Sequence, residues 1–329
     1  MNRRLALAVA AAALAVAGCG YDATVVPAPE APEAPAAAGP AEECADDVAG
    51  LSPVRSYAPT GPLPAPGDIE ADPDGSTVER IKAEGTLVVG VAADSFNLAY
   101  RNPETGVLEG FDIEMAKEVA RAIFGTSTPQ NTQFRVITPA QRFPLLQERE
   151  VDIVVRNMTI NCARWELIAF SAEYFHSGQK ILVRRNAGID DLRDLAGLRI
   201  CAPAGTTSIQ NIETEIPGAI PVTAANDTQC MVKFQRGEAD ALSTDDTVLA
   251  GLAAQDPYSE VLDQEALTDE PYGIGVNAEQ VDLVQFINAM LERMRRDGTW
   301  DEHYDRWLRP TLGDPTGKWP QPQYGRPLP

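Results

Sequence analysis

Histidine is scarce in this sequence, with only His176 and His303 among 329 residues. The cysteines form no CxxC pair and no cluster with histidine, so the ligand spacing of a zinc site is missing. A metal site or a nucleophile that depends on histidine therefore has almost nothing from which to be built. We expect no metal, no cofactor and no catalytic residue, so the protein is not predicted to be an enzyme.

A hydrophobic run long enough to cross a bilayer is also missing at the N-terminus. Leu5–Ala17 follows two arginines and has 13 residues, whereas a spanning helix needs about 20. The run leads into Gly18-Cys19, which resembles the lipobox of bacterial lipoproteins more than an ordinary secretory peptide that happens to contain a cysteine. We therefore predict a signal peptide over 1–18, lipidation of Cys19 and a location on the extracytoplasmic face of the cell membrane.

Positive charge is in the minority, since 27 Lys and Arg face 48 Asp and Glu and the net charge is −21. Removal of the signal peptide with its two arginines makes the net charge −23. A chain of this charge repels nucleic acid and anionic lipid surfaces, which excludes nucleic acid as a partner. Surface charge governs solubility and encounter, and it does not define the chemistry of a pocket.

Apolar residues are sparse from residue 19 to residue 76, where Pro, Ala and acidic residues dominate. This composition is typical of a solvated tether that cannot bury enough apolar surface to fold. Because exported proteins keep disulfides, we expect the four cysteines after Cys19 to pair and Cys44 to pin the tether to the folded body. These cysteines are Cys44, Cys162, Cys201 and Cys230.

Short β-branched runs alternate with helical patterns from Thr77 onward. Thr86–Val91, Phe134–Ile137 and Val151–Val155 are typical of buried strands separated by helices, which predicts an α/β fold around a largely parallel sheet. The alternation repeats farther along, so we predict two lobes joined by two hinge strands. The predicted boundaries are 77–180 and 274–310 for lobe 1, 181–273 for lobe 2, crossings near 181–184 and 272–276, and a Pro-rich tail at 311–329.

Polar side chains gather where the predicted strands end, which is the edge at which open α/β sheets bind ligands. Arg164 is a planar donor fork suited to a carboxylate, and Asp245 can hold an ammonium group. Hydroxyls and free helix N–H groups after Gly205 also suit an anion. This set fits an amino acid, with Arg156 left over for a side-chain carboxylate or an amide oxygen. The predicted ligand-binding residues are Asp94, Phe96, Arg156, Asn157, Met158, Thr159, Arg164, Gly205, Thr206, Thr207 and Asp245.

Each of these residues also has a simpler structural explanation. Arg164 could pair with Glu166 or Glu148 on the surface, where such ion pairs contribute little to stability. The segment 205–208 could serve only as a helix N-cap, and Asp245 could be only a turn residue. Arg156 would point outward if the strand direction changed by one position.

Several motifs in a fixed order resemble one known family. They are GTLVVGV, GFDIEMAKEVA, VDIVVRNMTINCARWELIAFS, GTTS, EADALSTDD and DGTWDEHYDRWL. Over Thr77–Leu308 the chain resembles the family 3 extracellular solute-binding proteins of amino-acid ABC transporters, most closely the glutamine/glutamate-binding lipoproteins of actinobacteria. The resemblance implies a two-lobed periplasmic-binding-protein-like (type II) fold that closes over one amino acid.

The resemblance also implies roles for single residues. Arg164 matches the family arginine that binds the α-carboxylate, and Thr159 matches a hydroxyl residue of the same loop. Thr206 and Thr207 match the carboxylate-binding loop of the second lobe. Asp245 matches the acid that takes the α-ammonium group.

Other implications concern the ligand side chain and the disulfides. Asp94 and Phe96 match a loop that supplies a polar group and an aromatic wall. Many relatives have a small residue where this chain has Arg156-Asn157, so glutamate, aspartate, glutamine and asparagine all fit as ligands. The family further implies a disulfide between Cys201 and Cys230, which leaves Cys44 to pair with Cys162.

We therefore expect an amino-acid-binding lipoprotein that acts as a monomer and presents its ligand to the permease of an ABC importer. An alternative role is to report the level of an amino acid to a membrane sensor protein. Dehydratases for prephenate-like acids share this scaffold, but they need a general acid or base in the cleft, for which Asp245 is the candidate here. An adhesin or a structural lipoprotein would not account for a cationic loop facing an acidic one.

Overall fold

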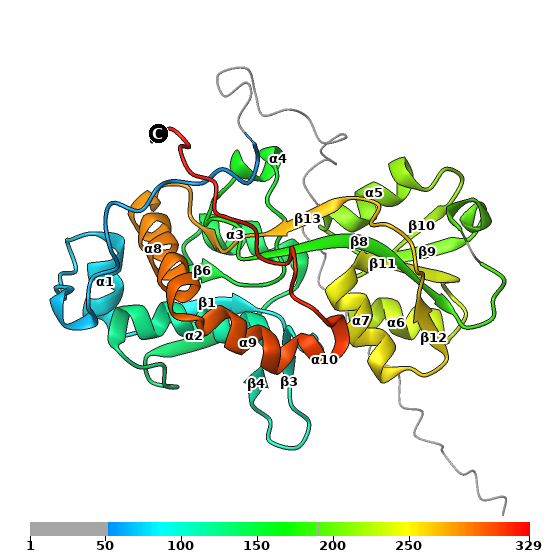
Figure 1. The fold of residues 1–329 in the computed structure, drawn as a ribbon, viewed down its shortest axis with the longest axis horizontal. Helices are drawn as coiled ribbons and strands as arrows, with labels where there is room; N and C mark the ends of the chain where they lie inside the picture. Colours follow the sequence, from blue (N-terminus) through cyan, green and yellow to red (C-terminus); the bar gives the residue numbers. More distant parts are fainter. Residues whose placement is uncertain (1–51, 190) are drawn as a thin grey trace, which may run out of the picture. The chain divides into compact units, whose positions relative to one another are not determined.

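The computed structural model describes residues 52–189 and 191–329. Its first lobe contains a sheet of five strands: β1 (Leu87–Val91), β5 (Thr132–Val136), β6 (Ile153–Val154), β7 (Ala169–Phe170) and β14 (Gly275–Val276). Their order is β5-β1-β6-β14-β7, and β1 and β6 are labelled in Figure 1. β1 is parallel to β5 and β6, whereas β14 is antiparallel to both of its neighbours. The parallel part agrees with the alternation of strands and helices in the sequence.

Helices with one apolar face pack on this sheet. α1 begins after a capping box formed by Ser76 and Glu79, and it ends at Gly85, whose φ of 72° is left-handed. The helices of lobe 1 are α1 (Thr77–Glu84), α2 (Phe111–Phe124), α3 (Arg142–Gln147), α4 (Cys162–Trp165), α8 (Val281–Asp297), α9 (Thr299–Trp307) and α10 (Arg309–Leu312). The remaining elements are the 3-10 turns η2 (Pro66–Asp68) and η3 (Pro139–Gln141) and a small sheet of β2 (Asp94–Ser95), β3 (Ala99–Arg101) and β4 (Leu108–Glu109).

The second lobe has a sheet of its own. Its strands are β8 (Phe175–Arg184), β9 (Arg199–Pro203), β10 (Ile220–Ala224), β11 (Ala241–Asp245) and β12 (Ser259–Val261), in the order β10-β9-β11-β8-β12. A disulfide between Cys201 and Cys230 joins β9 to a helix, which confirms this expected pair. The helices are α5 (Thr207–Glu215), α6 (Asp227–Gln235) and α7 (Asp246–Gln255), with the turn η4 (Leu192–Leu195).

Two strands connect the lobes. β8 pairs at its start with β13 (Asp269–Tyr272), in the register Phe175 to Tyr272, and only later with β11 and β12. The first crossing therefore lies before the stretch 181–184 expected from the sequence. Polar residues such as His176 and Gln179 belong to this strand, so its apolar pattern marks only its second half.

Residues 52–76 and 313–329 pack on lobe 1. Ser56 forms a bridge with Tyr324, Tyr57 is buried, and the Lys82 ammonium group donates to the carbonyl of Ile69. The expected tether therefore does not extend to residue 76, because a few apolar side chains within a Pro-rich and acidic segment are enough to pack.

Aromatic rings around α9 fasten the C-terminal segment to lobe 1. Trp300 stacks on Tyr304 and on Trp319, with ring centroids 5.2 and 4.8 Å apart. The indole N–H of Trp300 donates to the carbonyl of Tyr174.

Within 52–189 and 191–329, no helix has both the length and the apolar character that a membrane crossing requires.

Candidate functional site

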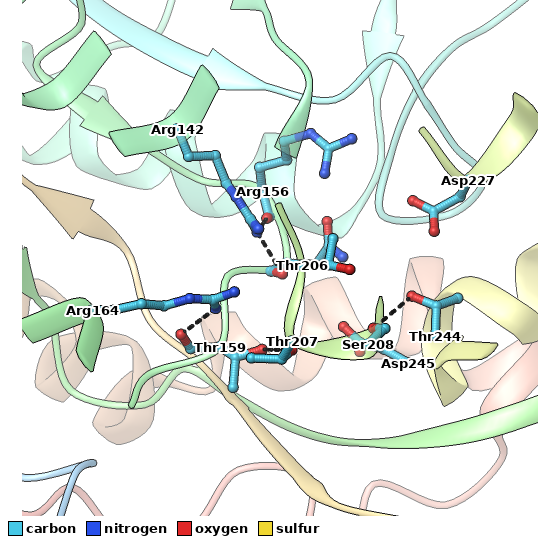
Figure 2. Close-up of a pocket in the computed structure, with 11 residues that line it drawn as sticks. Arg142, Arg156, Thr159, Arg164, Thr206, Thr207, Ser208, Asp227, Thr244 and Asp245 are labelled. Carbon is cyan, nitrogen blue, oxygen red and sulfur yellow. Dashed lines mark hydrogen bonds between the residues drawn. The ribbon is translucent and has the colours of Figure 1, made fainter. Parts of the chain in front are cut away.

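A pocket lies where strand ends of the two lobes face each other (Figure 2). It holds about 260 Å³ of space that protein atoms do not fill, part of it open to solvent. Every side chain of the lining is polar or charged. The lining residues are Arg142, Arg156, Asn157, Thr159, Arg164, Thr206, Thr207, Ser208, Asp227, Thr244 and Asp245.

Arg164 lies on α4 with its side chain directed inward. Asn161 is the N-cap of this helix, and its side-chain oxygen accepts a hydrogen bond from the Arg164 N–H. One guanidinium nitrogen donates to the carbonyl of Thr159 at 2.7 Å, and only 7% of the residue is exposed. This burial rules out the alternative surface ion pair. Burial lowers the pKa of Arg164, although the charges of Glu270 and Asp245 favour its cationic form.

Arg156 also points inward, at the end of β6. It is 1% exposed, and its Nε donates to the carbonyl of Ile137 at 3.0 Å. Its Nη2 is buried and has no hydrogen-bond partner among the described residues. The next residue, Asn157, has a positive φ of 32° and donates its backbone N–H to Asp112. The polar break after the strand therefore turns both side chains into the pocket.

Arg142, the first residue of α3, lines the pocket and was not predicted. Its donors are directed to backbone carbonyls, including those of Pro139 at 2.9 Å and Gly205 at 3.0 Å. Burial, followed by the charges of Arg164 and Arg156, lowers its pKa well below the ordinary value. The available signal was a cation one turn before Leu145 and Leu146, on the face of the helix that is buried.

The loop before α5 brings the second lobe close to the first. Gly205 has a φ of 76°, and a β-carbon there would lie 2.9 Å from the Cα of Ala140. Thr206 caps α5, since its hydroxyl accepts from the N–H of Ile209 and donates to the carbonyl of Pro203. The N-cap explanation is therefore correct for Thr206, which nevertheless lines the pocket.

Asp245 ends β11 directly before α7. The hydroxyl of Tyr272 donates to its carboxylate at 2.6 Å, and the residue is 3% exposed. Burial, with the charge of Glu270, raises the pKa of Asp245 well above the ordinary value. Its position at a strand end, with the side chain in the pocket, goes beyond that of a simple turn residue.

Glu270, on the hinge strand β13, was missed by sequence reasoning. Its carboxylate accepts hydrogen bonds from Thr159 and Thr207, which come from different lobes, and from Thr268 and Asn211. Glu270 thus joins the two halves of the pocket from behind. No motif marks it, because its partners meet only in the folded chain.

Four predicted residues, Asp94, Phe96, Met158 and Gly205, are absent from the lining. Met158 is fully buried in the apolar core of lobe 1, so its assignment to the pocket is wrong. Phe96 packs against Tyr100, with ring centroids 5.0 Å apart and ring planes inclined by 58°. Asp94 lies behind the lining, where its charge acts on Arg156 and its Oδ2 has no hydrogen-bond partner among the described residues.

Asp227, Ser208 and Thr244 also line the pocket; Ser208 and Thr244 directly adjoin the predicted Thr207 and Asp245, whereas Asp227 was not predicted. Asp227 is the first residue of α6, and Ser208 lies 3.5 Å from Thr244 between hydroxyl oxygens. The first turn of a helix favours acidic residues in any protein, so the sequence could not distinguish Asp227 from an ordinary helix-start residue.

Cys162 is part of a disulfide. Its expected partner, Cys44, and the predicted lipidation site, Cys19, both lie outside the described residues. Among the residues that the structure describes, no group of three or more His, Cys, Asp or Glu side chains is arranged to hold a metal ion.

The paired lobes, the two connecting strands and a pocket between them define a two-lobed binding fold of type II. The model of the bacterial extracellular solute-binding proteins, family 3, matches residues 87–310, and the chain belongs to this family.

Characterised relatives and solved structures agree with this assignment. The chain is 35% identical to the ABC transporter glutamine-binding protein GlnH of Bacillus subtilis, over 74% of this chain and 88% of that protein. It is 34% identical to the glutamate-binding protein GluB of Corynebacterium glutamicum, over 70% and 79% of the two chains. A mutant arginine-binding protein of T. maritima superimposes with a TM-score of 0.65 and 30% identity, over 70% of this chain and 98% of that one.

Proposed function

We propose that this protein binds one free amino acid between its lobes, from the set glutamine, glutamate, asparagine and aspartate. The observation that carries the proposal is the pair Arg164 and Asp245, two buried groups of opposite charge that line one pocket from different lobes. A zwitterion supplies the two opposite charges that such a pair requires. The similarity to glutamine- and glutamate-binding proteins supports this choice of ligands.

In this arrangement Arg164 and the hydroxyls around Thr207 hold the α-carboxylate. Asp245 holds the α-ammonium group. Because Asp245 and the Thr206 loop belong to one lobe and Arg164 to the other, a ligand that contacts both stabilises the closed arrangement. The short distance between Gly205 and Ala140, which come from different lobes, supports closure of the lobes around a ligand.

Binding without catalysis is part of the proposal. Asp245 is the acid closest to the role of a general base, but it already accepts a hydrogen bond from Tyr272. One similar solved structure, with a TM-score of 0.64 and 32% identity over 71% of this chain and all of that one, is described as an ancestral amino-acid-binding protein and a precursor of cyclohexadienyl dehydratase. An enzyme on this fold therefore stays the less favoured alternative.

The same proposal places the protein outside the cytoplasm as a monomer tethered through Cys19, with the signal peptide removed. Its partner is then the permease of an ABC importer, in line with the relative described as an ABC transporter glutamine-binding protein. A membrane sensor protein is the alternative partner. Co-purification from membranes with the full-length lipoprotein separates the two partners.

The proposed ligand is tested by calorimetric titration of the chain from Gly20 onward, which removes the lipidated cysteine and keeps Cys44. We expect at least one of glutamine, glutamate, asparagine and aspartate to bind with a micromolar or lower Kd. Glutarate, which has no ammonium group, is the matched control and should bind far more weakly. If none of the four binds more tightly than millimolar, the proposal is wrong.

A further inference from the structure

A buried acid faces the surplus arginine of the pocket. Asp227 is 3% exposed and Arg156 is 1% exposed. They belong to different lobes, Asp227 on α6 and Arg156 at the end of β6, and both line the pocket (Figure 2). Neither belongs to the Arg164–Asp245 pair proposed for the backbone of the ligand, so they are available to a ligand side chain.

Each of the two side chains has an unsatisfied atom. Asp227 Oδ1 and Arg156 Nη2 are buried and have no hydrogen-bond partner among the described residues. Leaving such a group unpaired costs about 1–3 kcal/mol, and more when it is charged. Arg156 Nη2 is therefore an unused donor in the lining and Asp227 Oδ1 an unused acceptor, with the side-chain oxygen of Asn157 as a second unused acceptor.

The charges around Arg156 are predominantly acidic. Asp94, Asp112 and Asp227 all act on its guanidinium group. Of these acids, Asp112 is engaged by the Asn157 N–H and the Tyr174 hydroxyl. The other nearby cation, Arg142, directs its donors to backbone carbonyls. A further carboxylate placed here would meet more negative than positive charge, whereas a neutral group would not.

We infer that Arg156 and Asp227 form a subsite for a primary amide, so that the protein prefers glutamine or asparagine to glutamate or aspartate. An amide has a carbonyl oxygen for Arg156 and an NH₂ group for Asp227, which is the combination that satisfies both unpartnered atoms. A carboxylate can only accept, so it leaves Asp227 unpaired and repelled. This inference rests on the proposed function, since it assigns the side-chain end of the same site.

Protonation of Asp227 gives the inference a second observable. Burial raises the pKa of Asp227 to about 6, with Asp94 raising it further and Arg156 and Arg142 opposing the rise. The negative charge of Asp227 also acts on Asp245. At pH 7.5 Asp227 accepts from an amide, and at pH 5.5 a protonated Asp227 can donate to a carboxylate. The preference for amides should therefore narrow on acidification.

The test is calorimetric titration of the chain from Gly20 onward with glutamine, glutamate, asparagine and aspartate. At pH 7.5 we expect the best amide to bind at least about tenfold more tightly than its acid. Asp227→Asn, which can donate to a carboxylate, should reduce this ratio by about tenfold or more. The matched control is Asp240→Asn, which lies in the same lobe outside the pocket and should leave the ratio unchanged.

The outcomes separate this inference from the proposed function. Equal affinity for amides and acids in the unmodified protein, or an Asp227→Asn ratio equal to that of the unmodified protein, overturns the amide subsite while leaving an amino-acid receptor. Absence of binding by all four ligands overturns the proposed function instead. Because each ratio compares ligands on one protein, partial misfolding of a variant does not change it. The decrease in the amide-to-acid affinity ratio between pH 7.5 and pH 5.5 can be measured on the unmodified protein. If this ratio is the same at both pH values, the inference is contradicted.

Discussion

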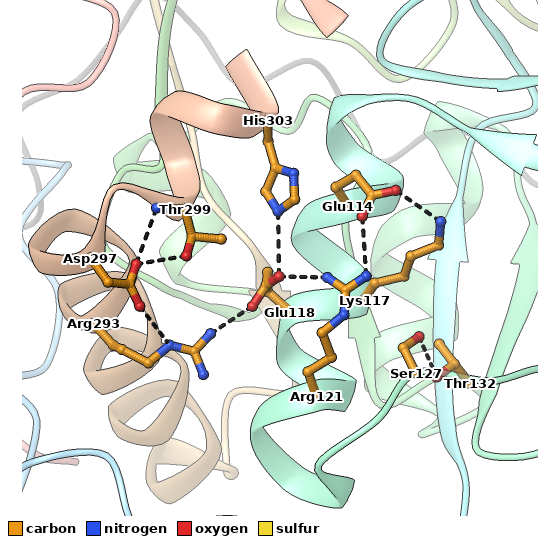
Figure 3. Close-up of polar contacts among 10 residues, drawn as sticks. All are labelled: Glu114, Lys117, Glu118, Arg121, Ser127, Thr132, Arg293, Asp297, Thr299 and His303. Atoms are coloured by element: carbon orange, nitrogen blue, oxygen red, sulfur yellow. Dashed lines mark hydrogen bonds and ion pairs between the residues drawn. The ribbon is translucent and has the colours of Figure 1, made fainter. Parts of the chain in front are cut away.

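Two clusters of buried charge in this molecule behave in opposite ways. On α2, Glu118 accepts from Arg121, Arg293 and His303, and Glu114 accepts from Lys117 and Arg121 (Figure 3). We call these residues the α2 network. Burial alone would raise the pKa of Glu118, but its partners bring it below the ordinary value.

In the pocket, by contrast, burial raises the pKa of Asp227 and that of Asp245. The guanidinium groups of Arg142 and Arg156 donate to backbone carbonyls, and Arg156 Nη2 has no hydrogen-bond partner among the described residues. The buried carboxylates of the two clusters therefore differ in how their charge is balanced. The carboxylates of the α2 network are paired with cations of the chain and contribute to stability, whereas Arg156 Nη2 and Asp227 Oδ1 in the pocket have no partner among the described residues, as expected of a site that a ligand completes.

Removal of a pocket cation should affect binding most strongly. We expect Arg164→Ala to weaken the binding of every amino-acid ligand by at least about 30-fold, since loss of a buried, hydrogen-bonded charge contact costs about 2–5 kcal/mol. Arg121→Ala in the α2 network is the control and should leave affinity unchanged. Calorimetric titration of both variants checks this, and similar losses in both would erase the distinction between the clusters.

The disulfide beneath the second-lobe half of the pocket should matter for stability. Cys201 and Cys230 are 29 residues apart in the chain and join β9 to the helix that carries Asp227. Replacing both by alanine should lower the free energy of unfolding by about 3–4 kcal/mol, by the loop-closure relation. Urea unfolding measures this loss. A variant as stable as the parent would show that the covalent bond does not support the pocket.

The contributions of the two clusters to the free energy of unfolding should also change with pH in opposite directions. The folded-state pKa of Asp227 is raised from 3.8 to about 6, so the folded state retains a proton that the unfolded state releases. Its contribution to stability therefore falls as pH rises from about 4 to about 6, by less than about 3 kcal/mol. Asp227→Asn should remove this fall. Urea unfolding of the parent and the variant at pH 4, 5, 6 and 7 tests this expectation. If the unfolding free energy changes with pH in the same way in both proteins, the raised pKa of Asp227 is contradicted.

The smallest effect is expected within the α2 network. Glu118→Gln keeps the shape but weakens the interactions with Arg121 and Arg293, so the unfolding free energy should fall by about 1–2 kcal/mol with ligand affinity unchanged. Glu84→Gln is the exposed control, because its pair with Arg80 is solvent-accessible and should contribute less than about 1 kcal/mol. A change in affinity on Glu118→Gln would break the comparison.

Sequence reasoning found the parts of the site that depend on local pattern. The polar break after a buried strand predicted Arg156, Asn157 and Thr159, and the short motif after β9 predicted Thr206 and Thr207. Resemblance to a known family then supplied roles that residue types alone had left open. Arg164 and Asp245 were identified by both means, and the structure places both in the pocket.

The rest of the site depends on packing between distant segments. Asp227 becomes a pocket residue, and Glu270 joins the two halves of the pocket from behind, only when the two lobes meet, and no spacing in the chain records that meeting. Met158 was assigned to the pocket wrongly because successive side chains of an extended segment point in opposite directions. Its neighbours point into the pocket, and Met158 therefore points into the core of lobe 1. Helix α7 was not predicted, since its alanine- and glycine-containing apolar run follows directly on a strand without a break.

A crystal structure of the protein with glutamine tests the central claim most directly, because it shows whether ligand charges complete the pocket. We predict the α-carboxylate against Arg164, the α-ammonium group against Asp245, and the side-chain amide between Arg156 and Asp227. Glutamine bound elsewhere, or bound with its α-carboxylate away from Arg164, would contradict the account.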